Sequence, residues 1–302
     1  MKLATIKISD GTVIALKTGN RLLLIDRAYG ALYNETSPPF LWDMRTLLEV
    51  GVMAFDEIHR LAERVETDQI EDSHFYIGED EADFAPPIVN PNKIICIGQN
   101  YRDHCIEQNK PFPKRPILFS KFAFALTGHK CEIIKPGLTE KLDFEGELAF
   151  VIGKHCHRIS QENAMDYIVG YSIFHDVSAR DIQFTDKQWL RGKTFPTFAP
   201  MGPYLVTADE IIDPSDLHIT TELNDSIMQD SRTSNMIFDV SYLVSFISQA
   251  IPLQPGDIVA TGTPNGVGFF RKEPIFLHDG DRVDINIDLL GKLSNTVIDE
   301  AL

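Results

Sequence analysis

Cysteine is scarce in this sequence. Four of the 302 residues are cysteines, and no two of them are spaced as a Cys-x-x-Cys pair: Cys96, Cys105, Cys131 and Cys156. This number and spacing argue against a zinc ribbon and against a disulfide framework for a chain of this length. A reducing compartment is therefore expected.

Basic residues are also few relative to acidic ones. Lysine and arginine number 28 against 44 aspartates and glutamates, which gives a formal net charge of −16. A field of this sign repels phosphate backbones and anionic lipid surfaces, so we expect neither nucleic acid nor a membrane as a partner. The same field opposes a small anionic substrate. A carboxylate substrate would therefore require a local positive centre, such as a bound metal ion.

The sequence has no long apolar run and no visible targeting segment. No run approaches the roughly 18 apolar residues of a membrane helix, and the first arginine is Arg21, so no Arg-rich transit peptide is apparent. We expect the cytoplasm or the mitochondrial matrix as the location. The glycine-rich stretch at 261–268 lacks the Gly-Lys-Ser/Thr ending of a phosphate loop, which argues against nucleotide binding.

The composition of the whole chain, 43% hydrophobic and 24% charged, is typical of a globular protein with a large core. β-prone runs at 3–8, 12–17 and 21–25 are separated by hairpin turn pairs and predict a β-meander. Helical spacing of apolar residues from 43 to 66 predicts one or two helices. The acidic, proline-rich stretch at 78–91 is typical of an exposed linker.

We therefore expect a small N-terminal domain, residues 1–90, and a larger domain, residues 91–302. The larger part shows many β-prone runs but only three helical segments, after Tyr101, at 161–167 and at 239–249. So few helices disfavour a doubly wound α/β sheet. The prediction is a β-rich α+β fold, a mixed β-sandwich roll with a small N-terminal α+β domain.

Glu145 and Glu147 precede an apolar run that predicts a strand over 144–152. Residues two apart in a strand share a face, so the two carboxylates would lie about 6 to 7 Å apart along it, followed on that face by Ala149 and Val151. Their repulsion, about 2 kcal/mol at an effective dielectric constant near 20, requires a neutralising group. A metal ion would supply it. An exposed acidic edge or salt bridges to Lys or Arg would serve equally well on these grounds.

Asp176 follows another apolar run, at 168–174, and is its first carboxylate. Strand ends contribute to binding sites more often than strand middles do. Three oxygen ligands from two strands would suit Mg²⁺ or Mn²⁺ and leave positions for water or substrate. A helix N-cap is the equally weighted alternative for Asp176.

His104 and Glu107 are three residues apart on the helix expected after Tyr101. At this spacing they share a helix face, so the carboxylate can fix the tautomer of the imidazole and raise its basicity. The pair is a candidate general base, although a solvated surface pair is the commoner reason for such a spacing. The segment from Tyr101 to Phe112 is expected to act as a mobile lid, because its Asn109-Lys-Pro-Phe-Pro end is typical of a flexible loop.

Five stretches occur in a specific order from about Asn90 onward. They are Asn100-Tyr-x-x-His104, Glu145-x-Glu147, Asp176-Val-Ser-Ala-Arg-Asp181, Gly192-Lys-Thr-Phe and Gly262-Thr-Pro-x-Gly-Val-Gly268. Together they resemble the fumarylacetoacetate hydrolase superfamily. One position departs from the pattern, since His175 stands where Asn is commonest before this Asp, and its effect on the site is open.

The resemblance implies a β-sandwich roll, a homodimer and a divalent cation. The cation would be Mg²⁺ or Mn²⁺, with Ca²⁺ able to replace it in crystals, held by Glu145, Glu147 and Asp176. Further roles implied by the resemblance are an acid/base dyad of His104 with Glu107, stabilisation of negative charge on substrate oxygens by Arg180, Gln183 and Lys193, and substrate contacts at Tyr101, Gly262 and Thr263.

The expected function is metal-dependent enolate chemistry on small 2-oxo carboxylates. Oxaloacetate enol/keto tautomerisation is slightly favoured by the resemblance, and hydrolysis of a C–C bond in an acylpyruvate is the alternative. A non-catalytic dimeric scaffold with a structural cation site is the third hypothesis.

Overall fold

The computed structural model describes residues 1–68 and 74–301. The N-terminal part opens with the predicted β-meander, in which β1 (Lys2–Ile8), β2 (Gly11–Thr18) and β3 (Arg21–Leu24) pair in succession. The three helices that follow are α1 (Ile25–Tyr33), α2 (Met44–Val50) and α3 (Val52–Thr67). The second and third lie where helical spacing predicted them, and α1 was not predicted.

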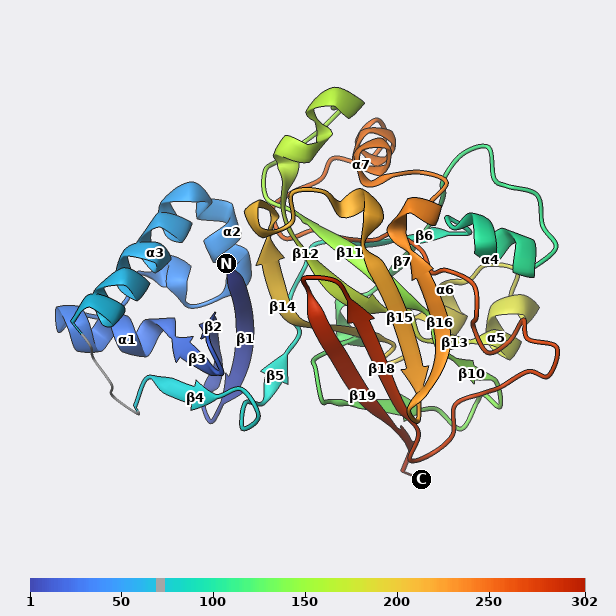
Figure 1. Ribbon diagram of the computed structural model, residues 1–302, viewed down its shortest axis with the longest axis horizontal. Coiled ribbons are helices and arrows are strands. Elements are labelled where there is room, and N and C mark those ends of the chain that lie inside the picture. The colour runs from blue at the N-terminus through green and yellow to red at the C-terminus, as the bar shows by residue number, and fades with distance from the viewer. Residues whose placement is uncertain (69–73, 302) are drawn as a thin grey trace.

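The meander is part of one large sheet, which includes strands from both parts of the chain and has 12 strands within the described residues (Figure 1). In spatial order its main path is β4 (Tyr76–Gly78), β3, β2, β1, β14 (Ala199–Thr207), β12 (Ile168–His175), β11 (Gly146–Ile152), β17 (Ile258–Ala260), β6 (Ile94–Gly98) and β7 (Ile117–Lys121), while β5 (Phe84–Ala85) pairs with β1 and β8 (Leu126–Thr127) with β14. The β1–β14 pairing joins the strands of the N-terminal part to those of the larger part in one sheet. The expected domain boundary near residue 90 stays a prediction.

The expectation of an exposed linker at 78–91 was wrong. Residues 84–88 are buried, and β5 pairs with β1. Phe84 packs in the core, and the carbonyl of Pro87 accepts a hydrogen bond from the Thr5 hydroxyl at 2.7 Å. Prolines break periodicity without requiring exposure, because they have no N–H group that must be satisfied.

A second sheet of five strands covers one face of the large sheet, and the predicted β-sandwich is confirmed (Figure 1). Its order is β16 (Ser226–Arg232), β15 (His218–Leu223), β18 (Arg282–Ile287), β19 (Gly291–Asp299) and β9 (Glu132–Lys135), and β10 (Leu142–Asp143) pairs separately with β13 (Ser178–Ala179). Both sheets mix antiparallel and parallel neighbours.

Alternate residues of β11 belong to two different hydrophobic clusters. Leu148 and Phe150 belong to the core between the sheets, whereas Ala149 and Val151 belong to the cluster that includes the N-terminal helices. All seven residues of β11 are buried. Glu147 therefore enters the interior on the same face as Ala149 and Val151, as the strand period predicted.

The larger part contains the three expected helical segments, two further α-helices and several short 3₁₀ turns. The expected ones are α4 (Arg102–Glu107), the 3₁₀ helix η3 (Gln161–Tyr167) and α7 (Val240–Ser248); the further α-helices are α5 (Arg180–Thr185) and α6 (Leu190–Lys193). The remaining 3₁₀ turns are η1 (Pro39–Leu41), η2 (Ala123–Ala125), η4 (Ala208–Glu210), η5 (Pro214–Asp216) and η6 (Thr233–Asn235). None of the described helices combines the length and apolar character needed to cross a membrane.

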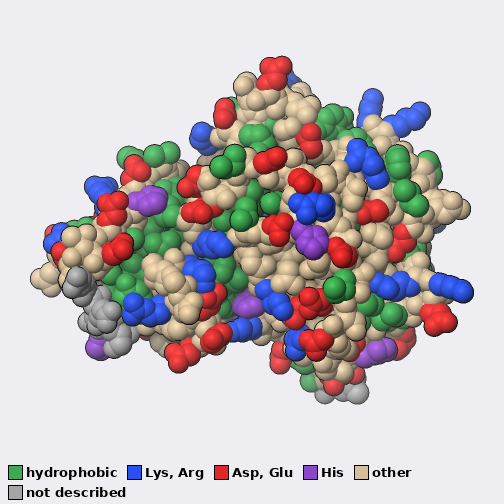
Figure 2. Space-filling model, in the orientation of Figure 1, with side chains coloured by type: hydrophobic (Ala, Val, Ile, Leu, Met, Phe, Trp, Pro, Cys, Tyr) green, Lys and Arg blue, Asp and Glu red, His purple; other side chains and the backbone are tan. Residues whose placement is uncertain are grey.

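Acidic side chains are spread over the drawn face of the surface among lysines, arginines and apolar groups (Figure 2). This distribution agrees with the formal net charge of −16. The carboxylates of Glu145, Glu147 and Asp176, in contrast, are buried.

Candidate active site and metal centre

Three buried acidic side chains meet where β11 begins and β12 ends. The two strands are antiparallel, so Gly146 pairs with His175, and the Asp176 N–H donates to the Glu145 carbonyl at 2.9 Å. One carboxylate oxygen from each of Glu145, Glu147 and Asp176 lies within 4.8 Å of the other two. The strand register therefore brings the three predicted metal ligands together.

Two lysines pair with this cluster. Lys193 Nζ lies 2.8 Å from Glu145 Oε2 and 2.6 Å from Asp176 Oδ2. Lys121 Nζ lies 2.7 Å from Asp176 Oδ1. The helix N-cap alternative for Asp176 was wrong, because Ala179 is the N-cap of α5.

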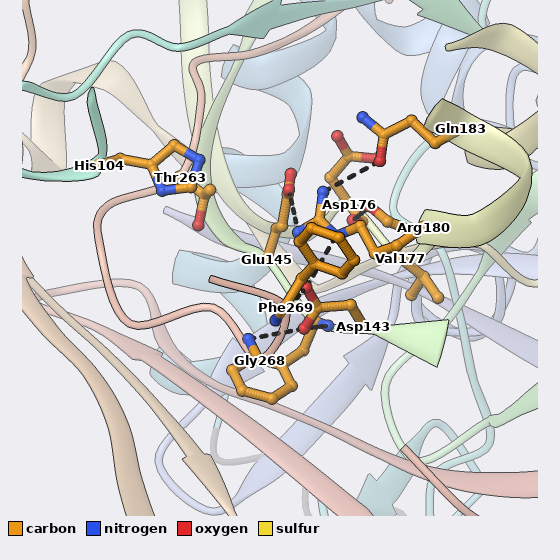
Figure 3. Close-up of polar contacts among 12 residues, drawn as sticks. His104, Asp143, Glu145, Asp176, Val177, Arg180, Gln183, Thr263, Gly268 and Phe269 are labelled. Carbon is orange, nitrogen blue, oxygen red and sulfur yellow. Dashed lines mark hydrogen bonds and ion pairs between the residues drawn. The ribbon is translucent and has the colours of Figure 1, made fainter. Parts of the chain in front are cut away.

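Arg180 joins the cluster to a fourth carboxylate (Figure 3). Its Nη2 lies 2.6 Å from Glu145 Oε1, and its Nε donates to Asp143 Oδ2 at 2.7 Å. Asp143 in turn accepts from the amides of Gly268 and Phe269, at 2.8 and 3.1 Å. The exposed-edge alternative for the two glutamates was wrong, whereas the salt-bridge alternative is realised for Glu145.

Asp143 anchors Arg180, and its replacement has a large expected cost. In Asp143→Ala the guanidinium stays buried and keeps only Glu145 as a carboxylate partner, so the free energy of unfolding should fall by about 3 to 5 kcal/mol. Urea denaturation measures this change. Asp216→Ala, which removes the carboxylate of an exposed pair with Arg232, is the matched control and should change stability little. Equal losses in the two variants would contradict the importance of burial.

The pKa values of the two glutamates move in opposite directions. Burial alone would raise the pKa of Glu145, but Lys193 and Arg180 hold it well below its ordinary value. Burial, followed by the charges of Asp176 and Glu145, raises the pKa of Glu147 well above its ordinary value. No described cation lies within ion-pair distance of Glu147, whose Oε2 accepts from the Gly262 N–H at 2.9 Å.

The donor set fits a hard divalent cation. Glu147 is a buried carboxylate that lacks a cationic partner, and it stands beside two further carboxylates, an arrangement suited to Mg²⁺ or Mn²⁺. With all four carboxylates ionised, the site has one more negative than positive charge, because it has three buried cations, Lys121, Arg180 and Lys193. A divalent ion would reverse that sign and supply the positive centre that a carboxylate substrate requires.

His104 and Glu107 form a fixed pair at the edge of the site. His104 Nδ1 lies 3.0 Å from Glu107 Oε2, and Glu107 Oε1 accepts from the Gly266 N–H at 2.9 Å. His104 is only 5% exposed, so the alternative of a solvated surface pair was wrong. In Figure 3, His104 and Thr263 lie on one side of Glu145, and Arg180 with Asp143 lies on the other.

One cavity connects the pair with the carboxylates. Among the predicted site residues, those that line it are His104, Glu145, Glu147, Arg180, Gln183, Lys193 and Thr263. Asp176 and Glu107 do not line the cavity; Asp176 pairs with Lys193, and Glu107 pairs with His104, both of which do. Tyr101 is fully buried, and Gly262 commits its amide to Glu147, so neither is among the residues that line the cavity.

Two further polar residues of the site were not predicted. Lys121 ends β7 and donates to the carbonyl of Phe198 at 2.7 Å as well as pairing with Asp176. Gln229 donates to Thr263 Oγ1 at 2.8 Å and accepts from the Gly146 N–H at 2.9 Å. A single lysine after an apolar run was the only signal for the first, and an isolated glutamine gave none for the second.

His175 is the position where this chain departs from the expected pattern. It is fully buried, and neither ring nitrogen has a hydrogen-bond partner. Burial, and then the positive charge of Lys121, lowers the pKa of His175 to about 3. The ring is therefore neutral at physiological pH and adds no charge to the site.

Comparison with known proteins places this geometry among enzymes. Residues 93–298 match the family described as fumarylacetoacetate (FAA) hydrolase C-terminal. The chain is 45% identical to a mitochondrial oxaloacetate tautomerase of Xenopus laevis, over 88% of this chain and 81% of the relative. A solved 2-hydroxyhepta-2,4-diene-1,7-dioate isomerase of Mycobacterium marinum is 33% identical with a TM-score of 0.74, and both chains are covered completely, 100% each. A solved maleylpyruvate hydrolase of Sphingobium is 28% identical with a TM-score of 0.76, covering 99% of this chain and 100% of the other.

Proposed function

The chain belongs to the fumarylacetoacetate hydrolase family, as its motifs indicated, and on that premise we propose that it catalyses the enol/keto tautomerisation of oxaloacetate. The observation that carries the proposal is that one cavity is lined both by Glu145 and Glu147 of the buried three-carboxylate cluster and by His104 of the His104–Glu107 pair. The activity named for the Xenopus laevis relative supports the choice of substrate.

Glu145, Glu147 and Asp176 would hold the metal ion, Mg²⁺ or Mn²⁺. When bound, such an ion polarises the carbonyl of a 2-oxo acid and makes the neighbouring carbon acidic. Lys193 and Lys121 fix two of the ligands in place, because they pair with the carboxylates of Glu145 and Asp176.

His104 moves the proton between carbon and oxygen. Its Nδ1 faces Glu107, so Nε2 is the atom that takes the proton from C3 of the keto form and delivers it to the 2-oxygen. Glu107, held by the amide of Gly266, stabilises the positive charge that develops on the ring. The direction reverses for the enol form.

Three side chains stabilise the negative charge on the substrate oxygens. Arg180 and Lys193 supply fixed positive charge at the cavity wall. Gln183 Oε1 accepts from Arg180 at 3.1 Å, which leaves the amide nitrogen of Gln183 as a donor for the substrate. Thr263 is the proposed contact for the substrate carboxylate, whereas Tyr101 and Gly262 support the cavity from behind its lining.

Hydrolysis of an acylpyruvate is the second candidate. The similarity to the maleylpyruvate hydrolase favours it, and the same His104 Nε2 could activate water instead of moving a substrate proton. We further propose a homodimer, in the mitochondrial matrix or the cytoplasm. The mitochondrial name of the Xenopus laevis relative supports the first of these compartments.

The test follows the ultraviolet enol band of freshly dissolved oxaloacetate, with Mg²⁺ or with chelator, and measures pyruvate at the end. Fast, metal-dependent decay without pyruvate is the expected result. Decay at the rate of the enzyme-free control would reject the tautomerase. Acylpyruvates would then be assayed for cleavage.

A further inference from the structure

Two glutamines that line the cavity have no part in the proposed reaction. Gln99 follows β6, and Gln108 follows the last residue of α4. Gln99 Nε2 donates to Gln108 Oε1 at 3.1 Å, and Gln108 Nε2 lies 2.6 Å from His104 Nε2. The two amides therefore form a chain that ends on the imidazole.

The structure places the NH₂ group of Gln108 toward His104 and its Oε1 toward Gln99. An amide NH₂ group donates and does not accept, and Gln99 offers its NH₂ to Gln108. Gln108 must therefore accept through Oε1 and present its own NH₂ to the ring. His104 Nε2 has to accept that bond, so it carries the lone pair, and the ring proton resides on Nδ1 opposite Glu107.

The backbone conformation of Gln99 indicates that its side chain is required at this position. Gln99 has φ of 55°, in the left-handed region where glycine or asparagine is favoured over glutamine. Such strain persists where the surrounding structure requires the particular residue. A glycine here would relieve the backbone but would release the Gln108 amide to rotate.

We propose that Gln99 and Gln108 are a positioning pair that holds the lone pair of His104 Nε2 toward the cavity and covers it until substrate displaces the Gln108 amide. This inference rests on the proposed role of His104 as the proton carrier. The cavity is narrow, with a volume of about 30 Å³. The Gln108 amide lies 2.6 Å from His104 Nε2, in the position that the reacting carbon needs, so substrate has to displace it.

Gln99 should act on His104 only through Gln108, and a double-mutant cycle tests this. Gln99→Met lets the Gln108 amide turn its oxygen to the ring, which selects the unreactive tautomer with Nε2 protonated. We expect Gln99→Met and Gln108→Met each to lower kcat about fivefold to tenfold, with a smaller change in KM. The double variant should lose no more than the larger single loss. If the kcat losses of the two single variants multiply in the double variant, the two glutamines act independently and the inference is wrong.

The second measurement is independent of activity. Nitrogen-15 NMR of the imidazole rings, with His104 assigned by its own substitution, reports the tautomer at mildly alkaline pH. Wild type should carry the proton on Nδ1, and Gln99→Met should move part of the population to Nε2. Protonation of Nε2 in the wild type would overturn the inference even if the tautomerase activity is present, and the expected tautomer would support it even if that activity is absent.

Two controls exclude a merely structural effect. Gln161→Met removes an exposed amide that contacts Ser241 at 3.0 Å, far along the chain from the site, and should change neither kcat nor the His104 signal. Melting temperatures confirm that the variants are folded at the assay temperature. A shift of the His104 signal in Gln161→Met would overturn the specificity claimed for the pair.

Discussion

Replacing His104 by alanine should lower kcat for oxaloacetate about a thousandfold while the protein still binds Mg²⁺. The imidazole is the proton carrier, whereas the candidate ion ligands are carboxylates at the strand ends of β11 and β12. Decay of the enol band measures turnover, and calorimetric titration measures Mg²⁺ binding. The two readouts separate loss of the base from loss of the metal centre.

A matched control exists for this substitution. His218 Nε2 lies 2.7 Å from Asp230 Oδ1, so it also forms a histidine–carboxylate pair, but in an exposed position on the five-stranded sheet. His218→Ala should retain full activity. Wild-type turnover in His104→Ala would contradict the mechanism, and no activity in any form of the protein, together with metal-dependent stability, would favour the scaffold alternative.

The strands of the sandwich were predictable where the sequence shows a clean period. The meander and β11 follow alternation or a continuous apolar run between turn residues, and these features come from local chemistry. β14 was missed although it lies in the centre of the large sheet. Pro200 and Pro203 lie within it, and proline in a sequence argues against a central strand.

Short helices were missed for a different reason. α5 and α6 have six and four residues, too few to show a helical period. Tertiary contacts hold them instead, and Gly192 of α6 lies so close to α5 that an added Cβ would come within 2.6 Å of the Gln183 backbone nitrogen. Packing of this kind has no local signature in the sequence.

The candidate ligands were predictable because their spacing reflects strand geometry, whereas their neutralising partners were not. Lys121 and Asp176 are 55 positions apart in sequence and meet only through the fold. The amide chain from Gln99 to His104 depends on a left-handed residue in one turn. Such contacts require coordinates, since no residue pattern specifies the rotamers involved.

Glu147→Gln should abolish Mg²⁺ binding and lower turnover at least about a thousandfold. Glutamine keeps the shape and can still accept from the Gly262 N–H, so the change removes charge with little loss of packing. Glu162→Gln, on the exposed surface of η3, is the control and should behave as wild type. A rise in melting temperature with Mg²⁺ that is equal in Glu147→Gln and wild type would place the ion elsewhere.

The same substitution should stabilise the metal-free protein, and the effect should depend on pH. The folded pKa of Glu147 is raised above its ordinary value of 4.5, so the folded state binds more protons than the unfolded state above that pH. The free energy of unfolding of metal-free wild type therefore falls as pH rises from 4.5 through the raised pKa, and Glu147→Gln lacks this loss. Urea denaturation in chelator across this pH range should show that the free energy of unfolding of the variant, relative to that of wild type, increases as pH rises. Because a divalent ion would offset the same buried charge, Mg²⁺ should restore the stability of wild type at higher pH and leave that of the variant unchanged. If the stabilities of the two proteins in chelator depend on pH in the same way, Glu147 is not a buried carboxylate without a cationic partner.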